Sequence, residues 1–245
     1  MEGIHVAIAA EQLTEWMGFP ITNSFLMSIV VLVVVLFLAL AVQVSIRLNP
    51  GKFQVALETV FGGYYDFIKE NLDNDKQTAD KFFPLLMTIV LFIFIANFLE
   101  FIPGVESIVV GEGEHAVPLF RSLNADLNTT IALALISFFV IEISGVRRFG
   151  VRYFSRFVNF HSVMGFFVGL IELISELIRL VSFSFRLFGN IFAGGILIGV
   201  LTFFVPYILP APFMVFEMFV GLLQGVVFSL LTLFFVKMAL TKAEH

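Results

Sequence analysis

The sequence predicts an all-α integral membrane protein with about five membrane-crossing helices, the last two long and steeply tilted as a hairpin. Three observations support this fold class. Hydrophobic residues occupy 59% of the 245 positions and charged residues only 13%, whereas soluble domains carry about 25% charged residues. The apolar residues form runs long enough to cross the roughly 30 Å of membrane hydrocarbon. The charged residues are concentrated between those runs.

The first part of the chain contains three separate apolar runs. Each has close to the roughly 20 residues that a membrane-spanning helix needs. The expected helices cover residues 24–46, 82–101 and 127–145. The segment 47–81 begins with an amphipathic pattern and then becomes polar, which indicates a cytoplasmic interfacial helix followed by a solvated loop.

The last part of the chain contains an apolar stretch that is too long for one upright span. Residues 162–204 lack proline, and a helix of that length would extend about 65 Å, roughly twice the hydrocarbon thickness. The stretch is therefore either two helices or one steeply tilted helix. The proline-rich segment 205–212 is expected to form an external turn, and a second long tilted helix is expected over residues 213–241.

The positive charges favour one tilted helix. Lysine and arginine collect in cytoplasmic loops, and eleven of the 14 basic residues lie in the segment 47–81, in the segment 146–161 or near the C-terminus. The external N-terminal segment 1–23 has no basic residue, and the external loop 102–126 has one. This distribution places the N-terminus outside and the C-terminus in the cytoplasm. Because an odd number of crossings is then required, residues 162–204 are expected to cross once, within a single membrane domain.

The composition excludes several kinds of site. The chain has no cysteine, so it has no disulfide, no thiolate metal site and no cysteine nucleophile. None of its four histidines has a partner at ligand spacing, and no basic patch with interleaved aromatic residues indicates nucleic acid. We therefore expect no metal, no cofactor, no catalytic residue and no nucleic-acid partner.

The long tilted helix carries a polar face. Six of its residues are spaced by 4, 3, 4, 3 and 4 positions, which places them on one side of a helix. They are Glu172, Glu176, Arg179, Phe183, Arg186 and Asn190. A charged side chain at mid-membrane costs about 2.5–3.5 kcal/mol and usually marks an ion pathway. We therefore predict that this polar face contacts water, its own charged members or another protein, and not lipid.

Other residues are expected to accompany the polar face. Glu217 and Gln224 lie seven residues apart on one side of the last helix, which the proline turn would bring close. Small residues allow close helix approach in membranes, so three glycines near Arg186 are expected to face a partner surface. These are Gly189, Gly194 and Gly195.

Some of these charges have simpler explanations. Glu176 and Arg179 could pair with each other as i, i+3 neighbours, and Arg179 alone could be an anchor that extends toward the interface. Glu100 and Glu142 lie near the ends of their spans, where structural or interfacial roles are favoured.

The segment RLFGNIFAGG, residues 186–195, closely resembles the signature of subunit a of F-type ATP synthases. The likeness continues in GLIELISELIRLVSFSF, ADLNTTIALAL and EMFVGLLQGVVFSLLTLFFV, and it covers most of residues 80–240. The resemblance implies an ion-translocating subunit, non-catalytic by itself, which packs against the ring of c subunits. Further implied partners are the b subunits of the peripheral stalk, the remaining ATP synthase subunits and membrane lipid.

The resemblance also implies residue roles. Arg186 matches the essential arginine, which faces a ring carboxylate and separates two half-channels that open on opposite membrane faces. Glu217 and Asn190 match positions that line the outward channel. Glu172 matches a residue of the cytoplasmic-side channel, and Gln224 matches a glutamine close to the arginine.

The residues at positions 195 and 217 differ from those of some family members. Those members have a titratable residue where this chain has Gly195, and a histidine where it has Glu217. One proton-carrying group then remains in the outward path, so water or another residue must supply the rest of the relay. Glu172, Glu176 and Glu217 are expected to act as relay groups.

Physical chemistry gives a reason for a permanently charged residue at position 186, independently of the resemblance. A carboxylate that turns through lipid travels protonated, because a bare charge there is costly. A fixed cation at one angular position favours the charged form, so the proton leaves on one side and is regained on the other. Arginine stays charged where a desolvated lysine could lose its proton. A proton that crosses directly past Arg186 meets an electrostatic barrier.

The main alternative is a secondary ion-coupled transporter. Transporters usually contain internal repeats with broken helices in corresponding positions, and no such repeat relates the two halves of this chain. An intramembrane enzyme would need a nucleophile–base pair or a metal cluster. The long charged loops favour a bacterial plasma membrane over a mitochondrial inner membrane, and the proton is the expected ion.

Overall fold

A computed structural model gives the structure of the chain and describes residues 10–46, 50–102, 108–111, 117–157, 163–206 and 208–241. Five helices in these ranges are long and apolar enough to cross a membrane. They are α1 (Asn23–Ser45), α3 (Lys76–Glu100), α4 (Leu127–Phe149), α5 (Val163–Phe204) and α6 (Pro210–Leu240). The expected all-α integral membrane fold is confirmed. The ends of the chain and parts of the segments expected as loops lie outside the described residues.

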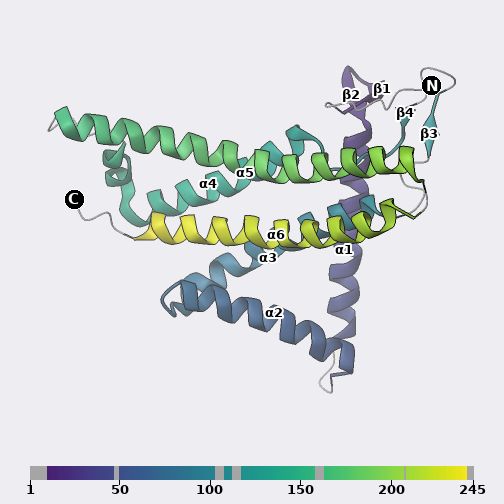
Figure 1. Cartoon of the computed structure of the whole chain (residues 1–245). Coiled ribbons are helices and arrows are strands. Elements are labelled where there is room, and N and C mark those ends of the chain that lie inside the picture. The colour runs from purple at the N-terminus through teal and green to yellow at the C-terminus, as the bar shows by residue number, and fades with distance from the viewer. Residues whose placement is uncertain are drawn as a thin grey trace.

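The two longest helices form the expected hairpin. α5 is one uninterrupted helix of 42 residues, which corresponds to about 63 Å, so the two-helix alternative is wrong. It runs antiparallel to α6 and packs against it, whereas α1 runs across the direction of both (Figure 1). If α1 stands upright in the bilayer, α5 and α6 are steeply inclined.

The helices α3 and α4 complete the core around this hairpin. α3 packs along α6, and α4 packs against both α5 and α6. A buried cluster that includes Ile93, Leu187 and Phe228 joins these helices at the level of the arginine at position 186. Gly225 permits the close approach of α3 to α6, since a Cβ there would lie 3.1 Å from the Val90 carbonyl oxygen.

The amphipathic helix α2 (Lys52–Asn71) is attached to α6 by polar contacts. Tyr64 and Ser229 share a 2.6 Å hydrogen bond between their hydroxyls, and Ser229 donates a 2.9 Å hydrogen bond to the Leu86 carbonyl. Burial raises the pKa of Tyr64 above its ordinary value, so this hydroxyl remains a hydrogen-bond donor even in alkaline solution. Just beyond α2, Asp73 forms a 2.8 Å ion pair with Lys237 near the end of α6.

Three helix boundaries differ from those expected. α6 begins at Pro210 and not at residue 213, because proline in the first turn of a helix sacrifices no hydrogen bond. α3 begins at Lys76, six residues earlier than expected. α4 continues to Phe149 and ends at Gly150, whose φ of +63° suits glycine. A short 3-10 helix, η2 (Gly150–Arg156), then follows where a loop was expected.

Two short β-hairpins were not expected. β1 (Gln12–Trp16) pairs with β2 (Phe19–Thr22), and β3 (Val109–Val110) pairs with β4 (Val117–Pro118), both antiparallel. The two-residue turn of the first hairpin has positive φ at both of its residues, as tight hairpins require. Both hairpins lie toward the end of the molecule where α5 turns into α6 (Figure 1).

Candidate functional site

Arg186 lies near the middle of α5 and is exposed on the surface of this chain. The neighbouring Phe183 and Leu187 are buried in the core. Arg186 lines a hollow of about 320 Å³ between α5 and α6, whose other polar lining residues are Ser175, Arg179 and Ser182. The guanidinium is therefore accessible to a group from outside this chain.

Asn190 and Gln224 connect α5 to α6 one turn from Arg186. Asn190 Nδ2 donates a 3.0 Å hydrogen bond to Gln224 Oε1. Asn190 is exposed, whereas Gln224 is buried, and Gln224 Nε2 has no hydrogen-bond partner among the described residues. Nearly all buried polar groups in native proteins have such a partner. This amide is therefore suited to bind water or a group from another subunit.

Glu217 lies on α6 directly against Gly194 of α5. Its side chain is buried, and Oε1 has no hydrogen-bond partner in the described part of the chain. Gly194 is buried too, and a side chain added there would overlap the Glu217 carboxylate. The expectation that Gly194 faces a partner surface is therefore wrong: its hydrogen makes room for Glu217. Gly195 is exposed and Gly189 has open space around it.

Glu100 is a second carboxylate at this end of α5, and the sequence did not identify it as a site residue. It is the last residue of α3, and a Cβ added at Gly195 would lie 3.9 Å from its Oε1. The Ser122 hydroxyl donates a 2.6 Å hydrogen bond to Glu100 Oε2. Glu100 and Glu217 thus approach successive positions of α5. The available signal was a carboxylate in the last turn of an apolar helix, for which we favoured an interfacial role.

Two buried asparagines adjoin these carboxylates. Asn97 lies one turn before Glu100 on α3, and its Nδ2 donates a 3.3 Å hydrogen bond to the Gly221 carbonyl, one turn after Glu217 on α6. Asn124 Nδ2 in turn donates a 2.6 Å hydrogen bond to Asn97 Oδ1. Two hydrogen bonds therefore join Asn97 of α3 to the main chain of α6 and to the segment before α4 at this end of the molecule.

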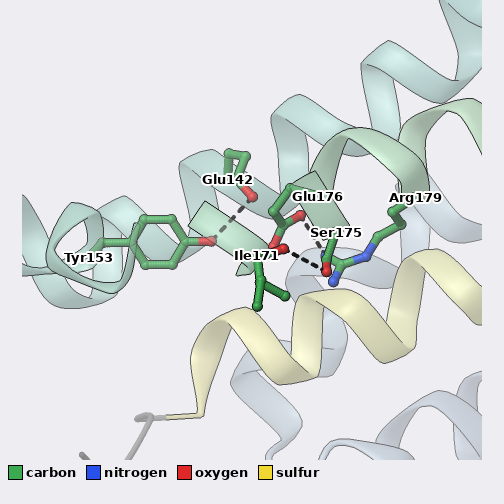
Figure 2. A network of polar contacts seen from close by, with 6 residues as sticks. All are labelled: Glu142, Tyr153, Ile171, Ser175, Glu176 and Arg179. Atoms are coloured by element: carbon green, nitrogen blue, oxygen red, sulfur yellow. Dashed lines mark hydrogen bonds and ion pairs between the residues drawn. The ribbon is translucent and has the colours of Figure 1, made fainter. Parts of the chain in front are cut away.

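Another acidic group lies toward the opposite end of α5. Glu172 is half-buried and Glu176 is buried. Glu142 of α4 accepts a 3.3 Å hydrogen bond from the Tyr153 hydroxyl of η2. Figure 2 shows the polar contacts of this region, in which Arg179 reaches back to Glu176. These carboxylates come from two helices and form a region separate from Glu100 and Glu217.

The expectation of one outward polar face is wrong for part of its length. Glu176 and Phe183 are 3% and 4% exposed, and Phe183 packs against the ring of Phe228 on α6. At about 100° per residue, the six members of the polar face spread over about 80° of the helix surface. Glu176 and Phe183 occupy the edge nearest the core, and Arg186 occupies the opposite, exposed edge.

The position of Arg186 separates the two acidic regions along α5. Glu100 and Glu217 lie toward the α5–α6 turn, which Figure 1 shows near the N-terminal hairpin, and Glu172 and Glu176 lie toward the other end. Along α5, the permanent positive charge of Arg186 therefore lies between the two acidic regions.

Comparison with known proteins shows the family of this chain. The sequence model described as ATP synthase A chain matches residues 24–237. The chain belongs to the ATP synthase A chain family. This membership confirms the resemblance, makes the chain a membrane-sector ion-channel subunit of an F-type ATP synthase, and disfavours the secondary transporter.

Members of the ATP synthase A chain family with the name ATP synthase subunit a align with most of this chain. The one from Sulfurihydrogenibium sp. (strain YO3AOP1) is 36% identical over 80% of this chain and 88% of its own length. The one from Mycobacterium bovis is 30% identical over 98% of this chain and 96% of its own length. A relative from Propionigenium modestum, named as sodium ion specific, is 30% identical over 97% of this chain and 80% of its own length.

The contact between Gly194 and Glu217 provides a first prediction for the ATP synthase complex. Gly194→Ala should displace the Glu217 carboxylate and lower ion-driven ATP synthesis by about tenfold, since overpacking a core costs about 1–3 kcal/mol. Synthesis per assembled complex in membrane vesicles measures the effect. Gly199→Ala is the matched control, because a Cβ there meets nothing within 4 Å. Normal synthesis in Gly194→Ala would show that this contact is not needed.

Proposed function

We propose that this chain is the proton-translocating subunit a of a bacterial F-type ATP synthase and that it forms two half-channels against the ring of c subunits. It is non-catalytic by itself and couples proton flow to rotation of the ring. The observation that carries the proposal is the exposed Arg186 between two separate acidic regions on the α5–α6 hairpin. The distribution of basic residues supports an external N-terminus and a cytoplasmic C-terminus in the plasma membrane.

The outward half-channel is assigned to the region around Glu217. Glu217 carries the proton next to Gly194, and Glu100 supplies the second carboxylate that the sequence pattern alone left missing. Asn97 and Asn124 provide hydrogen-bonding side chains that accommodate an incoming water chain. Asn190 and Gln224 complete the path beside the ring carboxylate, where Gln224 Nε2 is available as a donor.

The cytoplasmic half-channel is assigned to the other end of α5. Glu172 is half-buried there and accepts protons released at Arg186. Glu176 is less suited to this task than expected, because Arg179 already engages its carboxylate. The exposed apolar surface of α1 is assigned to membrane lipid and to the b subunits of the peripheral stalk.

Arg186 converts proton flow into rotation. A ring carboxylate that arrives protonated from lipid meets the guanidinium, whose charge favours loss of the proton toward the cytoplasmic side. The carboxylate can return to lipid only after it regains a proton from the outward side, because the ionised form is costly there. Each proton that moves through 100 mV releases about 2.3 kcal/mol, so several must pass for each ATP made.

Cysteine crosslinking tests the contact with the ring. Asn190→Cys should form a disulfide with cysteines placed on the ring-subunit helix that bears the carboxylate, because residue 190 is exposed beside Arg186. Phe183→Cys is the matched control, since residue 183 is buried against Phe228 and should not react. If Asn190→Cys and its exposed neighbours failed to crosslink while Phe183→Cys succeeded, the ring would contact a different face.

A further inference from the structure

We propose that Glu176 neutralises Arg179, so that Arg179 does not act on the ring carboxylate alongside Arg186. Glu176 then acts by holding the positive charge of Arg179 away from the rotor surface, and it does not carry protons. This inference rests on the proposed function, because it assumes that the hollow beside Arg186 receives a ring carboxylate.

The two arginines are close enough to compete. Arg179 precedes Arg186 by seven residues, which corresponds to two helical turns and about 10.5 Å along α5. Both side chains line the same hollow of about 320 Å³, and Leu231 and Phe235 of α6 form its opposite wall. Two free guanidinium groups in this hollow would attract a carboxylate at two places along α5, whereas the rotary mechanism requires one.

The structure holds Arg179 in an internal contact. Its Nη1 lies 2.7 Å from Glu176 Oε2, and the two side chains are only 16% and 4% exposed. The Arg179 guanidinium also stacks over the ring of Phe235, with its Cζ 3.7 Å from the ring centroid. A carboxylate on one side and an aromatic ring on the other together fix the orientation of the Arg179 guanidinium. Arg186 is exposed in the same hollow.

Aromatic packing keeps this pair in place. The Phe235 ring lies 5.7 Å from that of Phe183, which lies 5.2 Å from that of Phe228, so a row of rings joins α5 to α6 behind the hollow. Other charged groups toward this end include Glu172 on α5, Glu142 bound to Tyr153, Lys237 paired with Asp73, and Arg147 and Arg148 in the last turn of α4 (Figure 2 shows Glu142). Phe235 and Glu176 therefore direct the positive charge of Arg179 into the chain.

The test compares Glu176→Gln with Glu176→Gln/Arg179→Gln in the assembled ATP synthase. One readout is proton-driven ATP synthesis per complex. The other is the pH at which a carbodiimide half-maximally modifies the ring carboxylate, since carbodiimides react with the protonated acid. In Glu176→Gln the released charge of Arg179 should lower that pH by about one unit, from Coulomb's law at about 10 Å and an effective dielectric constant of about 20. Synthesis should fall about tenfold.

The double variant separates the explanations. Because it removes the cation together with its partner, both readouts should return to wild-type values. If Glu176 carries protons, the double variant will remain as slow as Glu176→Gln, which would overturn the inference. A pair with a purely structural role would change the amount of assembled complex but leave the modification pH at its wild-type value, which would overturn it as well.

Arg186→Ala in the same experiment distinguishes failure of this inference from failure of the proposed function. If Arg186→Ala leaves synthesis and the modification pH unchanged, the proposed function is itself wrong. If Arg186→Ala abolishes synthesis but the double variant is not rescued, the proposed function stands and Glu176 does not act through Arg179.

Discussion

Arg186→Ala is expected to abolish proton-driven ATP synthesis while the complex still assembles. Opposite charges about 4 Å apart interact by about 4 kcal/mol at an effective dielectric constant of 20, and each 1.36 kcal/mol corresponds to about tenfold in proton affinity. Loss of the guanidinium should therefore weaken proton release from the ring carboxylate by about a thousandfold. Assembly should persist because Arg186 is exposed on this chain and not part of its core.

The measurement for Arg186→Ala is ATP synthesis in inverted membrane vesicles under an imposed proton gradient, divided by the amount of assembled complex. Phe185→Ala serves as the matched control, since Phe185 is the adjacent exposed residue on α5 and carries no charge. It should retain most of the wild-type rate. A wild-type rate in Arg186→Ala would refute the central role of the arginine.

Glu217→Gln is expected to slow proton uptake from the outward side. Glutamine has the shape of glutamate and should keep the packing against Gly194, but it cannot carry a proton. Groups that transfer protons typically contribute about 10²- to 10⁴-fold to rate, so synthesis should fall by at least about 100-fold. The decrease should extend over pH 6 to 9, because the amide does not titrate.

Two comparisons make the Glu217 result specific. Glu217→Asp keeps a carboxylate and should recover part of the rate, whereas a loss equal to that of Glu217→Gln would indicate a packing defect. A normal synthesis rate for Glu217→Gln between pH 6 and 9 would show that the outward relay does not pass through this residue.

The membrane helices could be predicted because simple physical limits determine them. The hydrocarbon thickness fixes the length of a span, which identified the apolar runs that became α1, α3 and α4. The same limit showed that residues 162–204 could not stand upright, and the positions of lysine and arginine favoured one tilted helix. The observed α5 agrees with that choice. Helix spacing also placed Arg186 and Asn190 together on one face.

Other parts of the site depend on tertiary contacts that the sequence pattern does not reveal. Helical spacing defines the polar face of α5, but it does not show which edge of that face α6 covers, so the burial of Glu176 and Phe183 was missed. Glu100 approaches Gly195 only because α3 packs along α6 and ends beside α5. Gly194 was assigned to a partner surface because the spacing of residues on α5 does not show that Glu217 of α6 packs against it.

The most direct test of the account measures proton conductance with the ring locked to the stator by chemical crosslinking. We predict that the locked wild-type complex conducts no protons under an imposed gradient, because the only path between its half-channels requires rotation past Arg186. The locked Arg186→Ala complex should conduct, since the electrostatic barrier between the two acidic regions is gone. Equal conductance of the two locked complexes would contradict the claim that this arginine makes proton flow depend on rotation.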